Sequence, residues 1–199
     1  MSSGVGGVKL TKKIKIGITG LPGAGKTHAL RKVVEMLEEE GIKVGGMITE
    51  GITEGGKKQG FMVEDLLSKK KKVLARIDLD SPVTFLEYGV DMEALESIGV
   101  NAIADAINKA EVIVIDEVGK LEVESEKFIY IVKEALESDK PLLLTLHKKS
   151  RNPLLQDIRR RDDVRILEVT PINKNILPYK IIPLIKEELG PLRPPMDAY

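Results

Sequence analysis

Eight residues near the N-terminal end constrain the fold of this chain more than any other feature. The sequence at positions 20–27, Gly-Leu-Pro-Gly-Ala-Gly-Lys-Thr, matches the pattern G-x-x-x-x-G-K-S/T. Residues 12–19 alternate and then become apolar, as in a buried strand, and apolar residues recur at helical spacing over residues 26–40. A strand, a glycine-rich turn and a helix in this order predict a P-loop within an α/β fold.

The composition of this turn predicts phosphate binding. Glycines let the backbone curl so that its N–H groups point inward around phosphate oxygens, and the helix N-terminus adds partial positive charge. We expect Lys26 to contact the β- and γ-phosphates and Thr27 to ligate Mg²⁺. His28 is interpreted as a helix-surface residue rather than a base contact. The predicted nucleotide-binding residues of the loop are Gly20, Leu21, Pro22, Gly23, Ala24, Gly25, Lys26 and Thr27.

The rest of the chain alternates strands and helices, which predicts a mostly parallel sheet covered by helices on both faces. The strand over residues 141–146 is expected between the P-loop strand and the strand over 112–115, as in RecA-like proteins of the additional-strand type. Residues 59–67 and 73–77 predict a small β-hairpin. The domain is expected to span residues 12–189, with flexible tails at 1–11 and 190–199. The other predicted elements are strands 44–49 and 164–169 and helices 91–109, 124–138, 153–161 and 175–189.

A second motif ends the apolar, β-branched run at 112–115, where Asp116 and Glu117 follow. A buried strand that ends in an acid is the Walker B arrangement, so Asp116 is expected to hold Mg²⁺ through water. Glu117 is the candidate general base for an attacking water. Lys120 is a candidate catalytic cation, because charge that develops on the γ-phosphoryl oxygens is stabilised by a positioned cation.

Other polar residues leave alternatives open. Thr145 either contacts the attacking water or the γ-phosphate, or is a strand residue whose hydroxyl is satisfied locally. Arg151 and the residues at 159–161 are further candidate cations, although a solvated helix face is the preferred interpretation for Arg160 and Arg161.

A signalling GTPase is disfavoured by the later sequence. Residues 116–119 fit the pattern D-x-x-G of those proteins, which also need a guanine-reading N-K-x-D. Asn173 and Lys174 begin such a motif, but Ile176 stands where the aspartate is required.

Composition excludes several kinds of site and partner. The chain has no cysteine, which rules out disulfides, thiolate metal sites and a cysteine nucleophile. Its 31 basic and 31 acidic residues give zero net charge, which provides no signal for nucleic acid or an anionic membrane. No apolar run approaches the roughly 18 residues needed to span a bilayer. We expect a cytoplasmic monomer.

With these motifs in view, the chain resembles the THEP1 family of nucleoside triphosphatases from about residue 14 to 189. The most specific strings are Asp-Glu-Val-Gly-Lys-Leu-Glu at 116–122 and His-Lys-Lys-Ser-Arg-Asn-Pro-Leu at 147–154. The resemblance implies slow, Mg²⁺-dependent hydrolysis of several nucleoside triphosphates, with Gly119 and Asn173 among the nucleotide-binding residues. Lys174 departs from the arginine expected after Asn173, and His28 departs from the small or hydroxyl residue expected after Thr27.

A kinase remains the main alternative. It would transfer the γ-phosphoryl group to a nucleoside, a nucleotide or a polynucleotide end, and it would need an acceptor pocket and an arginine-rich lid. The arginines at 159–161 resemble part of a lid, whereas Glu117 directly after the Walker B aspartate favours activation of water. A third alternative is that hydrolysis is only the residual activity of an RNA- or protein-binding switch. The sequence lacks the aromatic platform and the basic excess that would support nucleic-acid binding.

Overall fold

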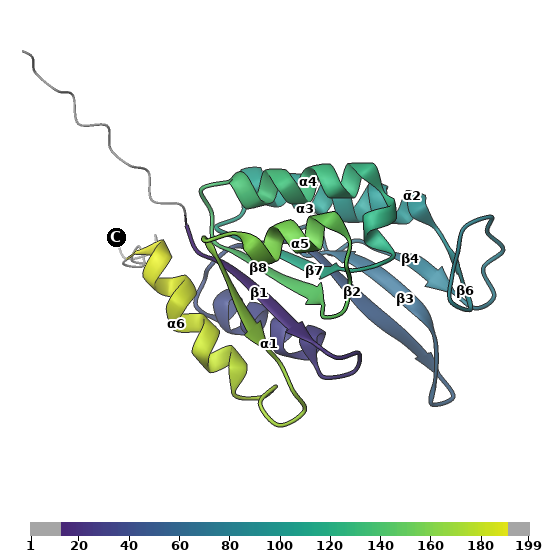
Figure 1. The fold of residues 1–199 in the computed structure, drawn as a ribbon, viewed down its shortest axis with the longest axis horizontal. Helices are drawn as coiled ribbons and strands as arrows, with labels where there is room; N and C mark the ends of the chain where they lie inside the picture. Colours follow the sequence, from purple (N-terminus) through teal and green to yellow (C-terminus); the bar gives the residue numbers. More distant parts are fainter. Residues whose placement is uncertain (1–12, 191–199) are drawn as a thin grey trace, which may run out of the picture.

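The computed structural model describes residues 13–190, and its strands form one nine-stranded sheet in the order β5-β6-β4-β3-β2-β7-β8-β1-β9. The expected tails at 1–11 and 190–199 lie outside the described residues, except for Gly190. Lys12, the predicted start of the first strand, also lies outside them. Figure 1 shows the sheet between two layers of helices. The predicted α/β class with helices on both faces is confirmed.

Parallel strands form the half of the sheet that carries the P-loop. β8 pairs with β1 on one side and with β7 on the other, so the predicted strand order is confirmed. Both faces of β1, β7 and β8 are buried, which explains the nearly unbroken apolar sequence of these three strands. The five strands are β1 (Lys15–Gly20), β2 (Val44–Glu54), β7 (Val112–Val118), β8 (Leu142–His147) and β9 (Val164–Glu168).

Antiparallel strands form the other half, called here the extension. β3 (Lys57–Asp65) and β4 (Lys71–Arg76) make the predicted hairpin. The extension is larger than predicted in two ways. β2 continues to Glu54 instead of ending at 49, because it pairs with β3 across a tight turn at Gly55 and Gly56, both with positive φ. β5 (Thr84–Phe85) and β6 (Tyr88–Val90) were not predicted, since two and three residues are too few to show a period.

Two helical layers bury the two faces of the sheet. α1 (Lys26–Glu39) and α6 (Leu177–Leu189) cover one face, while α3 (Asn101–Lys109), α4 (Glu126–Glu137) and α5 (Pro153–Arg160) cover the other (Figure 1). Alternate residues of β7 serve the two cores: Ile113 and Ile115 face the α3 and α4 side, and Val112 and Val114 face the α1 and α6 side. This packing fixes the ends of β1 and β7, where the predicted site lies.

Local hydrogen bonds adjust several predicted helix boundaries. Asp91 caps its helix as predicted, accepting from the Ala94 N–H at 2.9 Å. That helix comprises α2 (Met92–Ala94), a π-helical turn at Leu95–Val100, and α3. α4 starts at Glu126 instead of 124, because the Ser125 hydroxyl caps it by accepting from the Phe128 N–H at 3.2 Å. α6 starts at Leu177 instead of 175, after a series of turns at 171–176.

Candidate active site

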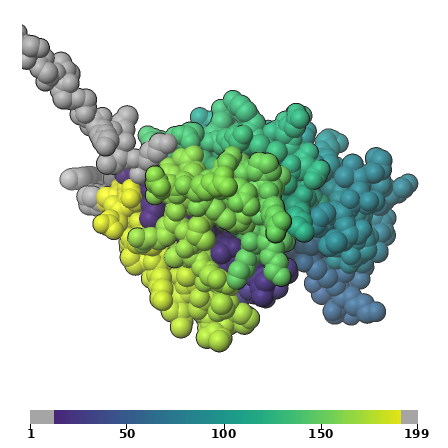
Figure 2. Space-filling view, in the orientation of Figure 1, coloured from purple at the N-terminus to yellow at the C-terminus, as the bar shows by residue number. Residues whose placement is uncertain are grey.

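A cavity of about 460 Å³ lies at the carboxyl ends of the parallel strands, between the P-loop and the extension. Ligands bind at this end of the strands in open α/β sheets. In Figure 2 the purple P-loop region reaches the surface between the yellow-green C-terminal part and the blue extension. The cavity is lined by Pro22, Gly23, Gly25, Lys26, Thr27, His28, Thr49, Gly51, Lys58, Phe61, Leu74, Ala75, Phe85, Leu86, Asp116, Glu117, Lys120, Leu121, Glu122 and His147.

The P-loop follows β1 directly and leads into α1. Gly25 has φ +104°, a conformation that side chains rarely adopt, and Lys174 packs so closely that a β-carbon there would come within 2.9 Å of its Cδ. A glycine is therefore needed at this turn. Gly23, Gly25 and Lys26 line the cavity at the point where α1 begins. The N-terminus of a helix is a favourable position for a phosphate group.

Lys26, the first residue of α1, extends its side chain back over the loop. Its Nζ lies 3.4 Å from the Gly20 carbonyl oxygen and 3.6 Å from Glu117 Oε2. The side chain of Lys26 is only 11% exposed and that of Glu117 is 29% exposed, so this pair is shielded but open to the cavity. The structure thus brings together two of the three predicted catalytic residues.

Asp116 is held by two hydroxyl groups. Thr27 Oγ1 donates to its Oδ2 at 2.8 Å, and Thr145 Oγ1 donates to its Oδ1 at 2.5 Å. Thr145 is fully buried, so of its two interpretations the structure shows the local hydrogen bond. Burial raises the pKa of Asp116 to about 6. The hydrogen bonds from the two hydroxyl groups lower this pKa, but their effect is smaller than that of burial.

These groups suit a divalent cation. Asp116 and Thr27 present only oxygen atoms, the donors that hard divalent cations prefer. Asp116 is 1% exposed, and no lysine or arginine in residues 13–190 forms an ion pair with it. A buried carboxylate without a cationic partner is costly. A bound cation would compensate that cost and favour the ionised form.

Gly119 lies where two carboxylates meet. A β-carbon at this position would come within 2.7 Å of both Glu117 Oε1 and Glu122 Oε2, so any other residue would push one of these groups aside. The backbone of Gly119 therefore serves the site by leaving room for Glu117. The predicted contact between Gly119 and nucleotide stays a prediction.

The structure separates the candidate cations. Lys120 is exposed and lines the cavity, whereas Arg151 is exposed and does not. Arg159 is engaged elsewhere: its guanidinium donates to the carbonyl oxygens of Ser150 at 2.9 Å and His147 at 2.6 Å, and so anchors the loop after β8. Arg161 pairs with Glu137 and Asp163. Of these candidate cations, Lys120 is the one that lines the cavity.

Comparisons with known proteins assign the sequence and the fold of this chain to one family. A family model described as NTPase matches residues 15–182. A nucleoside-triphosphatase THEP1 from Thermoplasma volcanium is 44% identical over 175 residues, covering 88% of this chain and 98% of that protein. The chain belongs to the THEP1 family of nucleoside triphosphatases. A THEP1 from Methanocaldococcus jannaschii is also 44% identical, over 135 residues that cover 68% of this chain and 79% of that relative.

Two solved structures share the fold. THEP1 from the hyperthermophile Aquifex aeolicus has a TM-score of 0.76 and 29% identity, covering 87% of this chain and 99% of that one. A human cancer-related nucleoside triphosphatase has a TM-score of 0.72 and 31% identity, covering 89% of this chain and 98% of that one. As a member of the THEP1 family the chain is a nucleoside triphosphatase, a hydrolase of the P-loop type. Across residues 13–190, the helices are too short or too polar to cross a membrane.

In this THEP1 member, the loop before α6 packs against the P-loop, where Lys174 lies next to Gly25. Asn173 shapes that loop: its Oδ1 accepts from the Thr170 N–H at 2.7 Å, and its Nδ2 donates to the Glu168 carbonyl at 2.9 Å. His28 is exposed and its Nε2 lies 3.0 Å from Asn175 Oδ1, but it also lines the cavity, so the absence of a base contact stays a prediction. A contact between Asn173 and nucleotide stays a prediction, and the geometry gives the residue a role in shaping the loop.

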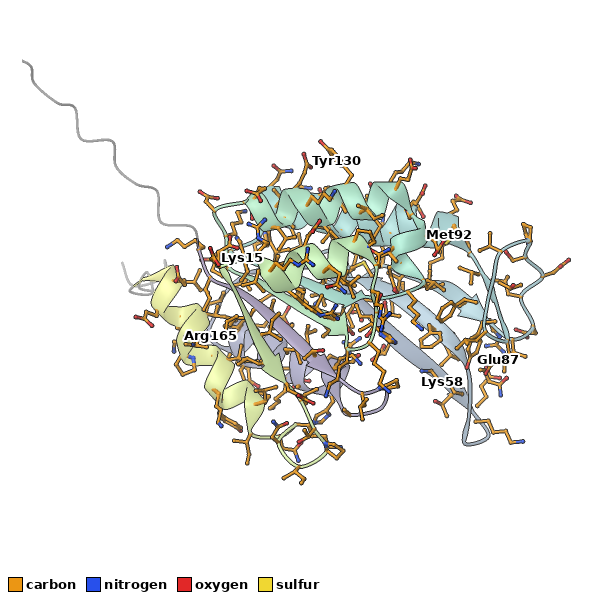
Figure 3. All side chains as sticks on the ribbon, viewed as in Figure 1. Lys15, Lys58, Glu87, Met92, Tyr130 and Arg165 are labelled. Atoms are coloured by element: carbon orange, nitrogen blue, oxygen red, sulfur yellow. The ribbon has the colours of Figure 1, made fainter. Side chains whose placement is uncertain are left out.

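Several residues of the THEP1 cavity were not predicted as site residues. Lys58 comes from the extension, far from Lys15 at the opposite end of the strands (Figure 3), and its ammonium lies 3.9 Å from the centre of the Phe61 ring. His147 ends β8, and burial lowers its pKa, which favours the neutral imidazole. Glu122 is buried in the cavity wall. Glu122 and His147 both lie within the family-specific strings, which is the one signal that pointed to them.

Proposed function

We propose that this protein hydrolyses nucleoside triphosphates to diphosphate and phosphate, slowly, with Mg²⁺ and with broad base preference. The observation that carries the proposal is the distance of 3.6 Å between the Lys26 ammonium and the Glu117 carboxylate. Next to this pair, Asp116 accepts a hydrogen bond from Thr27. These groups supply a phosphate contact, a base and a cation site within one cavity. Loss of turnover in variants at Lys26 and Glu117 tests it, as argued in the Discussion.

The mechanism follows from the positions of these side chains. The backbone N–H groups of the P-loop and Lys26 bind the phosphates and orient the γ-phosphoryl group toward Glu117. Glu117 accepts a proton from a water molecule as the water oxygen bonds to the γ-phosphorus, and the bond from that phosphorus to the leaving diphosphate breaks. Thr27 and Asp116 would hold Mg²⁺, which when bound neutralises charge on the phosphate oxygens. Thr145 keeps Asp116 oriented.

We predict similar turnover of ATP, GTP, CTP and UTP, within about tenfold of one another. The phosphate contacts are common to all four nucleotides, and residues 173–176 lack the aspartate that reads guanine. Phosphate release from each nucleotide at saturating concentration is the measurement. A preference of about a thousandfold for one base, roughly 4 kcal/mol at 1.4 kcal/mol per factor of ten, would contradict broad preference.

A second prediction concerns Lys120. If its ammonium stabilises charge on the γ-phosphoryl oxygens, Lys120→Met should lower kcat by about 10- to 100-fold with little change in KM. Arg151→Ala is the matched control, because this exposed cation does not line the cavity and should leave kcat unchanged. Equal kcat values for Lys120→Met and wild type would remove Lys120 from the mechanism.

A kinase is the second candidate, and one observation favours it. The cavity wall also includes the apolar side chains of Phe61, Phe85 and Leu121. The phosphate groups of a nucleotide do not account for these apolar side chains. Incubation with γ-labelled ATP and a panel of nucleosides, nucleotides and 5′-hydroxyl oligonucleotides separates the two functions. Label on an acceptor would establish a kinase, and label only in free phosphate supports the hydrolase.

We also propose a cytoplasmic monomer whose catalytic domain spans residues 12–189. The sequence supports this with balanced charge and with no cysteine for the disulfides common in secreted proteins. Light scattering of the purified protein tests the monomer, with a dimeric mass as the contradicting result. Hydrolysis by a fragment trimmed to residues 12–189 tests the domain limits.

A further inference from the structure

Glu122 is a buried acid that the proposed mechanism does not use. It begins the short 3-10 helix Glu122–Glu124 that follows β7, and it is only 5% exposed although it lines the cavity. Burial raises the pKa of this carboxyl group, and this effect is larger than that of the backbone at Gly119 and Glu122, which lowers the pKa. Within residues 13–190 no lysine, arginine or histidine forms an ion pair with it. A buried, unpaired carboxylate is strongly disfavoured relative to the neutral acid.

Glu122 faces Glu117 across Gly119. One oxygen of each carboxyl group, Oε1 of Glu117 and Oε2 of Glu122, comes within 2.7 Å of the point where a β-carbon on Gly119 would lie. The other oxygen of Glu117, Oε2, is the one that approaches Lys26. The candidate base is therefore bordered by a cation on one side and by Glu122 on the other.

Electrostatics favour a neutral Glu122. Burial is the largest cause, the charge of Glu117 is the second, and together they raise the pKa of Glu122 to about 8. Two facing carboxylates do not ionise together readily. The other titratable or charged groups around this part of the cavity are Asp116 from β7, Lys26 from α1, Lys58 from β3, His147 from β8 and the exposed Lys120.

We propose that Glu122 is a positioning residue whose neutral carboxyl group donates a hydrogen bond to Glu117 and holds that carboxylate toward the attacking water. The inference rests on the proposed hydrolysis for its effect on turnover. When Glu122 ionises, the donor is lost and its charge repels Glu117, so turnover falls as the pH rises through about 8. Gly119 leaves room for both carboxyl groups because it has no side chain.

The same geometry predicts a pH effect on stability that does not depend on catalysis. The folded-state pKa of Glu122, about 8, lies above the ordinary value of 4.5, so the folded protein binds the proton more tightly than the unfolded chain. Stability is then lost as the pH rises from about 4.5 through about 8. Glutamine at 122 reproduces the neutral acid and removes this loss.

The test compares Glu122→Gln, Glu122→Ala and wild type between pH 6 and 9.5. We expect Glu122→Gln to keep kcat within about threefold at pH 7 and to lose the decline near pH 8, because the amide still donates. Glu122→Ala should lower kcat at pH 7 by at least about tenfold with little change in KM. Glu124→Gln is the matched control, since this exposed glutamate on the same turn lies outside the cavity. Superimposable pH profiles for wild type and Glu122→Gln, or full activity of Glu122→Ala, would overturn the proposal.

Thermal unfolding of the nucleotide-free proteins keeps the two proposals distinguishable. The melting temperature of Glu122→Gln should rise relative to wild type as the pH increases from 6 to 9, whether or not any variant releases phosphate. A constant difference across this range would overturn the neutral Glu122 by itself. If the difference rises but no variant hydrolyses nucleotide, the proposed function fails while the neutral acid facing Glu117 stands.

Discussion

Replacing Lys26 with alanine is expected to abolish most nucleotide turnover and leave the fold intact. Lys26 Nζ is the cation that extends over the P-loop, where the β- and γ-phosphates are expected. Its loss should lower kcat/KM by about 10³-fold, comparable with the loss of one preorganised donor to transition-state charge. The side chain does not belong to either hydrophobic core, so far-UV circular dichroism and the melting temperature should stay near those of wild type.

Lys32→Ala is the matched control for this variant. Lys32 lies on the same helix and outside the cavity, and its only ion pair within residues 13–190 is with Glu35. Its loss should therefore leave phosphate release unchanged. Hydrolysis at the wild-type rate by a folded Lys26→Ala protein would contradict the P-loop assignment itself. A folded but inactive Lys26→Ala protein beside an active Lys32→Ala protein would support it.

Much of the fold follows from the sequence, because parallel strands and their covering helices carry strong periodic signals. The apolar runs at 112–115 and 141–146 predicted buried strands. The P-loop motif predicted where β1 ends and where α1 begins. The extension was harder to predict. β5 and β6 are too short to show a pattern, and their positions depend on the pairing of β6 with β4 and of β5 with β6.

The site was predictable where function rests on local backbone geometry and unpredictable where it rests on burial. Lys26, Thr27, Asp116 and Glu117 lie in or directly after motifs, and the structure brings all four together. Burial of a polar side chain is decided by distant groups. Arg159 looks like a free cation in sequence, yet its partners are carbonyl oxygens of the loop after β8.

Lys15 and Glu122 show the same limit. Lys15 begins an alternating stretch, where a lysine normally faces solvent, yet it is fully buried because its ammonium donates to the carbonyl oxygens of Ser138 at 2.7 Å and Lys140 at 2.5 Å. Glu122 stands between apolar neighbours, Leu121 and Val123, so alternation also predicts exposure. The 3-10 turn after β7 points it into the cavity wall instead.

Replacing Glu117 with glutamine should slow the chemical step by about 10²–10⁴-fold, the usual contribution of a positioned base. The amide keeps the size of the side chain but does not accept a proton from water. Lys26, Thr27 and Asp116 remain in place, so the variant should bind Mg²⁺-ATP with affinity close to that of wild type. A lower kcat with unchanged affinity is the signature of an interaction made only in the transition state. Single-turnover phosphate release and equilibrium titration with a fluorescent nucleotide measure the two quantities separately.

One control variant makes the Glu117→Gln result decisive. Glu124→Gln changes an exposed glutamate outside the cavity by the same chemistry, and it should keep the wild-type kcat. The pair of variants therefore separates loss of a base from loss of a negative charge in this region. Normal phosphate release by Glu117→Gln would remove Glu117 from the mechanism. Weakened nucleotide binding with an unchanged single-turnover rate would instead assign Glu117 to ground-state binding, which its contact with Lys26 alone does not predict.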